Sequence, residues 1–221
     1  MELLDNVSWT NGHHSVRAGF DINVGPQYMT REKNAGGLYT FATFADYQAG
    51  KIQQYQQAIP TKGSKGYYEE TQKDFAVFVQ DAITLRSHLT LTAGLRWDGQ
   101  VNPQPTNPNP KYPVTSQIPN DLTMWQPRLG VAYDVGGRGR TVIRASTGMF
   151  DSRTPGYLLQ RAFTDNGIDV LSVNSATDPS VLTYLTIPNA LTAIPPGVAL
   201  PINSIYAFSP SFRNPRSFQI A

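Results

Sequence analysis

The sequence contains no cysteine, which excludes disulfides, thiolate metal sites and cysteine nucleophiles. It also lacks any uninterrupted run of about 18 apolar residues, so we expect no membrane-spanning helix. Charged residues make up only 15% of the 221 residues, against roughly 25% in soluble proteins. The 18 basic and 16 acidic residues form no concentrated basic run, so nucleic-acid binding has no electrostatic support.

Signals for export and for catalysis are missing too. The opening residues MELLDNVSWT have no basic segment followed by an apolar stretch, so any secretory signal is expected upstream of residue 1. The catalytic patterns GxSxG and HExxH are absent. Glu69 and Glu70 are adjacent, and in an extended chain they point apart rather than act as an acid–base pair. We therefore expect no enzyme activity and no cofactor.

What the sequence does contain is strict alternation of apolar and polar residues. In LTLTAGLRWD, residues 89 to 98, the apolar side chains fall on one side of an extended chain and Thr90, Thr92, Arg96 and Asp98 fall on the other. Such a strand has one apolar wall and one polar wall. In a soluble sandwich the apolar wall meets a protein core, whereas in an outer-membrane barrel it meets lipid.

Further stretches of the same kind predict an all-β, antiparallel, up-and-down sheet of about seven strands. The predicted strands are residues 2–10, 14–24, 73–85, 89–98, 125–135, 141–150 and a last segment that ends at Ala221. Residues 102–113, NPQPTNPNPKYP, contain five prolines in 12 positions and forbid a regular ladder. Residues 39–44 are a possible short strand, and helical turns are possible near YLLQRAF and SVLTYL.

The lengths of the connections decide between the two kinds of sheet. Turns of about three, three and five residues alternate with loops of about fifty, twenty-five and fifty residues. In an up-and-down sheet all short turns then lie at one end, as in outer-membrane barrels with short periplasmic turns and long extracellular loops. Soluble sandwiches have little reason to show this asymmetry, and long loops without structure count against a compact soluble domain. The prediction is a transmembrane β-barrel segment.

On this interpretation the alternation assigns each strand residue to a face. Arginine pointed at lipid near the bilayer centre costs about 2 to 4 kcal/mol, so all strand arginines should point into the lumen. The predicted lumen-facing residues are Arg17, Arg96, Arg128 and Arg144. The predicted lipid-facing or interfacial residues are Phe20, Val77, Val79, Leu89, Leu91, Leu95, Trp97, Leu129, Val131 and Tyr133. Trp9 and Trp125 also fall near strand ends, where aromatic rings favour the membrane interface.

The strands themselves resemble a known family. The blocks DNVSWTNGHHSVRAGFD, FAVFVQDAITLRSHLTLTAGLRWD and WQPRLGVAYDVGGRGRTVIRASTGMF are similar, in this order, to the barrel of TonB-dependent outer-membrane receptors, especially the branch with a carboxypeptidase-regulatory-like domain. Ile83 stands where that branch often has Trp, and Asp151 where Tyr is common. The resemblance implies that residues 1–221 are part of a larger barrel with a plug inside it. It also implies a periplasmic box pulled by the TonB complex.

Candidate metal sites are weak. The three histidines, His13, His14 and His88, lie at short turns, and a metal site would need them to converge with Asp5 or Asp81. DNGID at 165–169 suggests an oxygen-rich calcium loop but lacks the spaced carboxylates of an EF-hand. Solvated turns explain both, and no metal is expected.

Three functions remain open at this stage. The first is a TonB-dependent receptor that binds a bulky solute, such as a siderophore or an oligosaccharide, and transports it across the bacterial outer membrane. Its partners would be outer-membrane lipid, the extracellular solute, the plug and the TonB complex. The second is a passive porin or adhesin barrel, and the third is a soluble β-sandwich that binds a ligand.

Overall fold

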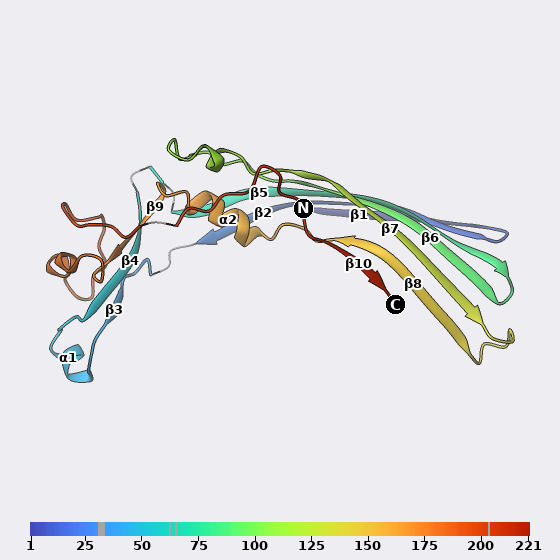
Figure 1. Ribbon diagram of the computed structural model, residues 1–221, viewed down its shortest axis with the longest axis horizontal. Helices are drawn as coiled ribbons and strands as arrows, with labels where there is room; N and C mark the ends of the chain where they lie inside the picture. Colours follow the sequence, from blue (N-terminus) through green and yellow to red (C-terminus); the bar gives the residue numbers. More distant parts are fainter. Residues whose placement is uncertain (31–33, 62, 65, 203) are drawn as a thin grey trace.

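The computed structural model describes residues 1–221 except 31–33, 62, 65 and 203 (Figure 1). Its main element is a seven-stranded antiparallel sheet in which each strand pairs with the next. The strands, in their order across the sheet, are β1 (Glu2–Asn11), β2 (His14–Thr30), β5 (Tyr67–Arg86), β6 (Leu89–Val101), β7 (Asp121–Asp134), β8 (Val142–Asp151) and β10 (Arg216–Ile220). The predicted up-and-down antiparallel topology is confirmed.

The short and long connections lie at opposite ends of this sheet. The β1–β2, β5–β6 and β7–β8 turns gather at one end, and the long connections gather at the other (Figure 1). Gly12 in the first turn has φ of +56°, a value that glycine adopts without steric cost. Strands β6 and β7 extend three and four residues further than predicted, to Val101 and from Asp121. Two strands extend by six residues, because β2 continues to Thr30 and β5 begins at Tyr67. Their outer parts carry polar residues on both faces, so the alternation that marked the inner parts is missing there.

The long connections build a second, three-stranded sheet that the sequence pattern did not predict. It consists of β3 (Leu38–Thr40), β4 (Gln54–Pro60) and β9 (Val170–Asn174). The predicted strand at 39–44 is only partly right, because β3 ends at Thr40 and the short helix α1 (Phe44–Gln48) follows. The 3-10 helix η2 (Pro179–Tyr184) covers the predicted helical turn at SVLTYL. We call residues 34–61 and 166–202 the outer cap.

A second helix, α2 (Gly156–Thr164), lies where YLLQRAF predicted helical turns. It packs Leu159 and Ala162 against Tyr68 of β5 and Ile118, and these residues form one of two hydrophobic clusters. Strand β6 ends at Val101, and the proline-rich stretch that follows forms no strand. The 3-10 helix η1 (Pro113–Ser116) begins at the last proline of this stretch. No helix of the described residues has the length and apolar character needed to cross a membrane.

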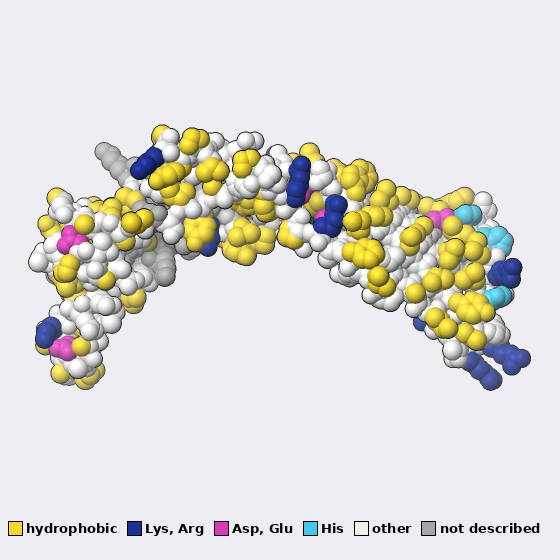
Figure 2. Space-filling view, in the orientation of Figure 1, with side chains coloured by type: hydrophobic (Ala, Val, Ile, Leu, Met, Phe, Trp, Pro, Cys, Tyr) yellow, Lys and Arg dark blue, Asp and Glu magenta, His cyan; other side chains and the backbone are white. Residues whose placement is uncertain are grey.

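Among the residues that the structure describes, none forms a protein layer over the apolar side of the seven-stranded sheet. Leu129 is 60% exposed, Val77 51% and Leu95 42%, although each lies in the middle of its strand. Both hydrophobic clusters lie at the long-loop end instead, the second one around Tyr55 and Val173 in the outer cap. The space-filling view shows hydrophobic side chains spread over the strands, with histidine and basic side chains at the short-turn end (Figure 2). Within the described residues, no second sheet stacks on this surface as a sandwich would require.

Candidate functional site

The pairing register places all four predicted lumen-facing arginines on one face of the sheet. Arg17 pairs with Gln80, Gln80 with Gly94, and Gly94 with Arg128. Directly paired residues point to the same side, so this row shares a face. Arg96 lies two residues from Gly94, and Arg144 pairs with Ala132, so both belong to it too. We call it the polar face.

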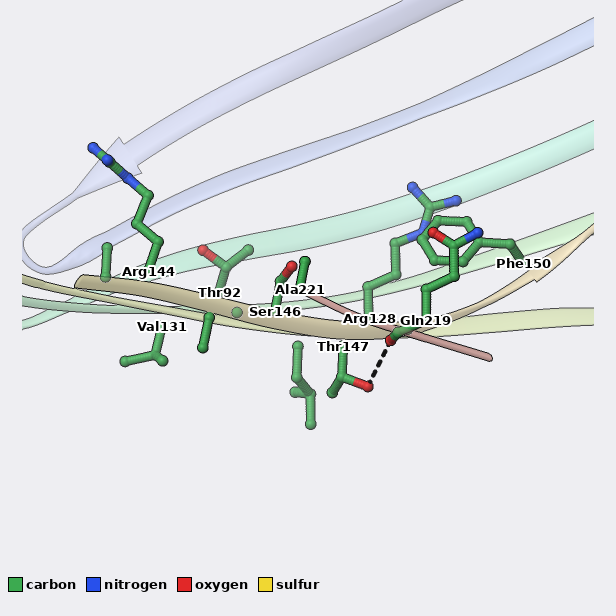
Figure 3. Close-up of a pocket in the computed structure, with 14 residues that line it drawn as sticks. Thr92, Arg128, Val131, Arg144, Ser146, Thr147, Phe150, Gln219 and Ala221 are labelled. Carbon is green, nitrogen blue, oxygen red and sulfur yellow. Dashed lines mark hydrogen bonds between the residues drawn. The ribbon is translucent and has the colours of Figure 1, made fainter. Parts of the chain in front are cut away.

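The predicted lipid-facing residues all lie on the opposite side, the apolar face. Leu95 pairs with Val79, and Leu89 pairs with Tyr133. The close-up shows the separation directly, with Arg128 and Arg144 on one side of the sheet and Val131 on the other (Figure 3). The remaining members of this set follow by alternation along the same strands: Phe20, Val77, Leu91, Trp97, Leu129 and Val131.

Aromatic residues mark two levels of the apolar face. Trp97 pairs with Trp125, their rings 6.3 Å apart, and eight residues along β6 Leu89 pairs with Tyr133. Eight residues of antiparallel strand span about 27 Å, or about 21 Å after a tilt of about 40°. The distance is close to the apolar band of about 25 Å in outer-membrane barrels. Trp97 and Trp125 lie inside their strands rather than at the ends, because β6 and β7 extend beyond this level.

On the polar face, Arg96 belongs to a partly buried group of ion pairs. Its Nε lies 2.8 Å from Asp98 Oδ1, and a terminal nitrogen lies 3.7 Å from Asp21 Oδ2. Arg153, which follows β8, lies 3.5 Å from carboxylate oxygens of both Asp21 and Asp74. Gln126 donates a further hydrogen bond to Asp98. Two cations therefore face three carboxylates, and the charges of this belt are nearly balanced.

A segment of chain crosses the polar face beside these ion pairs. We call residues 152–164 the strap. Thr154 N donates to Gln100 Oε1 (3.0 Å), and Gln72 Nε2 donates to the Thr154 carbonyl (3.2 Å). Asn214 Nδ2 also donates to Gln100 Oε1 (3.1 Å). Helix α2 in the strap then packs over β2 and β5.

Sequence reasoning missed the strap, because Arg153 and Thr154 lie in a stretch without periodicity. One signal was present. Gln72 and Gln100 lie on the polar face of β5 and β6, where their side-chain amides can both donate and accept hydrogen bonds. Buried amides of this kind need partners, and a crossing backbone segment supplies them.

The outer cap is held by polar contacts between distant parts of the chain. Tyr55 donates through its hydroxyl to Gln57 Oε1 (2.5 Å), which in turn accepts from the Leu191 amide (3.0 Å). Burial raises the pKa of Tyr55. Hydrogen bonds from the Ala199 amide and from Ser180 lower the pKa of Asp178.

Aromatic side chains are exposed on the surface of the cap. Phe44 is 72% and Tyr47 58% exposed on α1, and their rings stack at 6.0 Å. Phe41 meets Tyr47 edge-on at 5.3 Å. Exposed aromatic groups of this kind supply contact area for a ligand at small entropic cost.

The structure does not bring the three histidines together. His14 Nδ1 lies 2.6 Å from Asp81 Oδ2, and His88 packs against the Tyr133 ring at 5.6 Å. No group of three or more metal-ligating side chains occurs among the described residues. In DNGID, residues 165–169, Asp165 pairs with Arg161 and Asn166 Nδ2 donates to Asp169 (2.8 Å), so polar protein groups occupy these oxygens.

A family model described as "outer membrane beta barrel domain" matches residues 1–221, the whole chain. The chain belongs to the outer membrane β-barrel family. The fold-class prediction is therefore confirmed, and the bacterial outer membrane is where this β-barrel resides. No curated protein and no solved structure matches the chain. In the described part of this outer membrane β-barrel domain, β1 and β10 are the two edges of an open sheet.

Proposed function

We propose that this outer membrane β-barrel belongs to a TonB-dependent receptor, which binds a bulky solute at its outer cap and passes it inward along the polar face. In this proposal the apolar face contacts lipid, the polar face lines the lumen, and the short turns face the periplasm. The plug and the TonB complex, as the sequence resemblance implies, would be its partners. The mechanism is binding and gating without covalent chemistry.

The observation that carries the proposal is the co-folding of the long connections. Strand β4 comes from the β2–β5 connection and pairs with β9 from the β8–β10 connection, Gln57 opposite Val173. A passive barrel needs no such structure on its loops, whereas a receptor needs loops held in one arrangement to recognise a solute. The exposed aromatic group on α1 is suited to stacking against that solute.

The first part of the strap, residues 152–155, supplies a movable element. It rests on the polar face through hydrogen bonds to Gln72 and Gln100 and through ion pairs of Arg153, whereas α2 is held by its apolar contacts with Tyr68 and Ile118. Polar contacts of this kind exchange readily for contacts with water or with a solute. Displacement of the strap would widen the path that it now crosses.

Two measurements on the full-length protein test the proposal against a passive porin. We expect the purified receptor to bind the periplasmic domain of TonB in biolayer interferometry. We also expect it to give no steady conductance in planar bilayers with KCl, because a plug closes the lumen. Steady open channels together with no TonB binding would overturn the proposal and favour the porin.

A further inference from the structure

The polar face carries three arginines that lack the carboxylate partners of Arg96. Arg17 donates through Nε to Asn6 Oδ1 (3.2 Å), and Arg128 donates to Gln126 Oε1 (3.3 Å). Within the described residues, no ion pair involves Arg17, Arg128 or Arg144. Asp134 is a carboxylate on the same face of β7, and its Oδ2 accepts from the Gly139 amide in the turn. The part of the polar face around Arg17, Arg128 and Arg144 therefore carries a net positive charge, whereas the charges around Arg96 are nearly balanced.

Arg128 and Arg144 flank a hollow of about 540 Å³. Its floor consists of small residues of β7 and β8, among them Gly130, Ala132 and Gly148. The close-up shows Arg144 at one end and Arg128 at the other, with Thr92 and Ser146 between them (Figure 3). A cavity of this volume falls in the range of small-molecule sites, about 300 to 1,000 Å³.

The polar groups that line the hollow suit an anion. The guanidinium of Arg128 lies 4.7 Å from the Phe150 ring, and its Nε is buried without a hydrogen-bond partner. A buried donor without a partner is costly for the folded protein. Thr92 and Ser146 add hydroxyl groups that can donate to the same ligand.

The register sets the length of the ligand. Arg144 pairs with Ala132, which lies four residues from Arg128 on β7. Four residues of antiparallel strand correspond to about 14 Å between the backbone positions of the two arginines. A single small anion therefore reaches only one guanidinium, whereas an elongated molecule with an anionic group at each end reaches both.

We infer that this hollow on the polar face binds a free, elongated dianionic solute, whose two phosphate or carboxylate groups are held by Arg128 and Arg144. Charge complementarity selects this occupant, since within the described residues neither guanidinium forms an ion pair. The inference rests on the proposed function only in taking the polar face as the lumen. It names the class of solute that the barrel interior would hold.

The test is equilibrium binding to the full-length protein in detergent at low ionic strength, measured by titration calorimetry. The matched probes are fructose 1,6-bisphosphate, fructose 6-phosphate and fructose, with suberate as a dicarboxylate. We expect the bisphosphate to bind most tightly and fructose not to bind. Comparison of the affinities for the bisphosphate and for suberate shows whether the site prefers phosphate or carboxylate groups. This assay needs no TonB and no energy, so its result is independent of the transport proposal.

Variants locate the site. Each of Arg128→Gln and Arg144→Gln should weaken binding at least about tenfold, since a lost charge-assisted hydrogen bond is worth about 1.5 to 3 kcal/mol. Arg138→Gln removes the same single charge from the adjacent turn and should leave affinity unchanged. Gly130→Leu should fill the hollow and abolish binding with both guanidiniums present. Gly130→Ala is its control, because the added Cβ meets nothing closer than 3.7 Å.

Three outcomes overturn the inference. The first is that neither the bisphosphate nor suberate binds to the unmodified protein. The second is an equal loss of affinity in the turn variant, which would indicate nonspecific attraction. The third is that Arg128→Gln and Arg144→Gln lower the unfolding temperature of the protein measured without ligand. That result would mean that the arginines pair with a carboxylate of the protein itself.

Discussion

At the scale of single residues, the side to which each strand residue points follows from the two-residue period of the chain. Asp81 is a charged residue among apolar ones, since it lies on the apolar face between Val79 and Ile83. Its Oδ2 lies 2.6 Å from His14 Nδ1, while its Oδ1 is buried without a hydrogen-bond partner. The Asp81 carboxylate therefore has one polar partner, the imidazole of His14 on β2.

A double-mutant cycle measures this dependence. We expect His14→Leu to lower the free energy of unfolding by about 1 to 3 kcal/mol, because it leaves a carboxylate unpaired on an apolar surface. Asp81→Leu alone should be tolerated, and His14→Leu with Asp81→Leu should recover most of the loss. The measurement is urea unfolding of the full-length protein in lipid vesicles. Additive effects of the two substitutions would show that the pair does not interact.

At the scale of elements, the strands fall into two groups with different sources of stability. In the described part of the chain, the hydrophobic clusters lie at the long-loop end, so the rest of the seven-stranded sheet depends on its backbone ladder and on what covers the apolar face. The three-stranded sheet has a small core instead, in which Tyr55, Ile59, Val173 and Val181 are almost completely buried. The outer cap is thus expected to unfold separately from the sheet that supports it.

Val173→Asp tests this separation. Val173 is 1% exposed, and a carboxylate placed there costs several kcal/mol because it has no partner. We expect limited proteolysis to cleave within residues 34–61 and 166–202, while circular dichroism retains the signal of the main sheet. Val114→Asp, at a position that is 45% exposed, is the matched control and should resist the protease. Loss of the main sheet in Val173→Asp would show that the two sheets fold as one unit.

At the scale of the whole molecule, the short turns and the outer cap lie at opposite ends of a long curved sheet (Figure 1). The arrangement predicts that these ends occupy different compartments, with the sheet between them in the membrane. Because residues 1–221 include no cysteine, single cysteines introduced into this domain can be followed without removing others from it.

Cysteine labelling of cells that express the full-length protein tests the orientation. We expect a membrane-impermeant maleimide to label Tyr47→Cys on intact cells, and Arg138→Cys only after the outer membrane is permeabilised. Leu129→Cys should stay unlabelled in both, because the thiolate that reacts does not form in hydrocarbon. Labelling of Arg138→Cys on intact cells would reverse the assigned orientation, and labelling of Leu129→Cys would place the apolar face in water.

Much of the main sheet was predictable because its signals are local. The turns at Asn11–Gly12 and Arg86–His88, and the alternation around them, gave the strand order and the placement of the four arginines on one face. The ends of β2 and β5 were not predictable, since their outer residues are polar on both sides. The ion pairs of Arg153 were not predictable either, because they join segments far apart in the sequence.

By itself, the sequence determined which side chains share a face and which connections are short, because both depend only on neighbouring residues. Only the tertiary structure decided that β4 pairs with β9 across more than a hundred residues, that the strap crosses the polar face, and that Arg128 and Arg144 flank one hollow. Such contacts form when distant segments come together to satisfy buried polar groups and bury apolar ones, and no local pattern records which segments will meet.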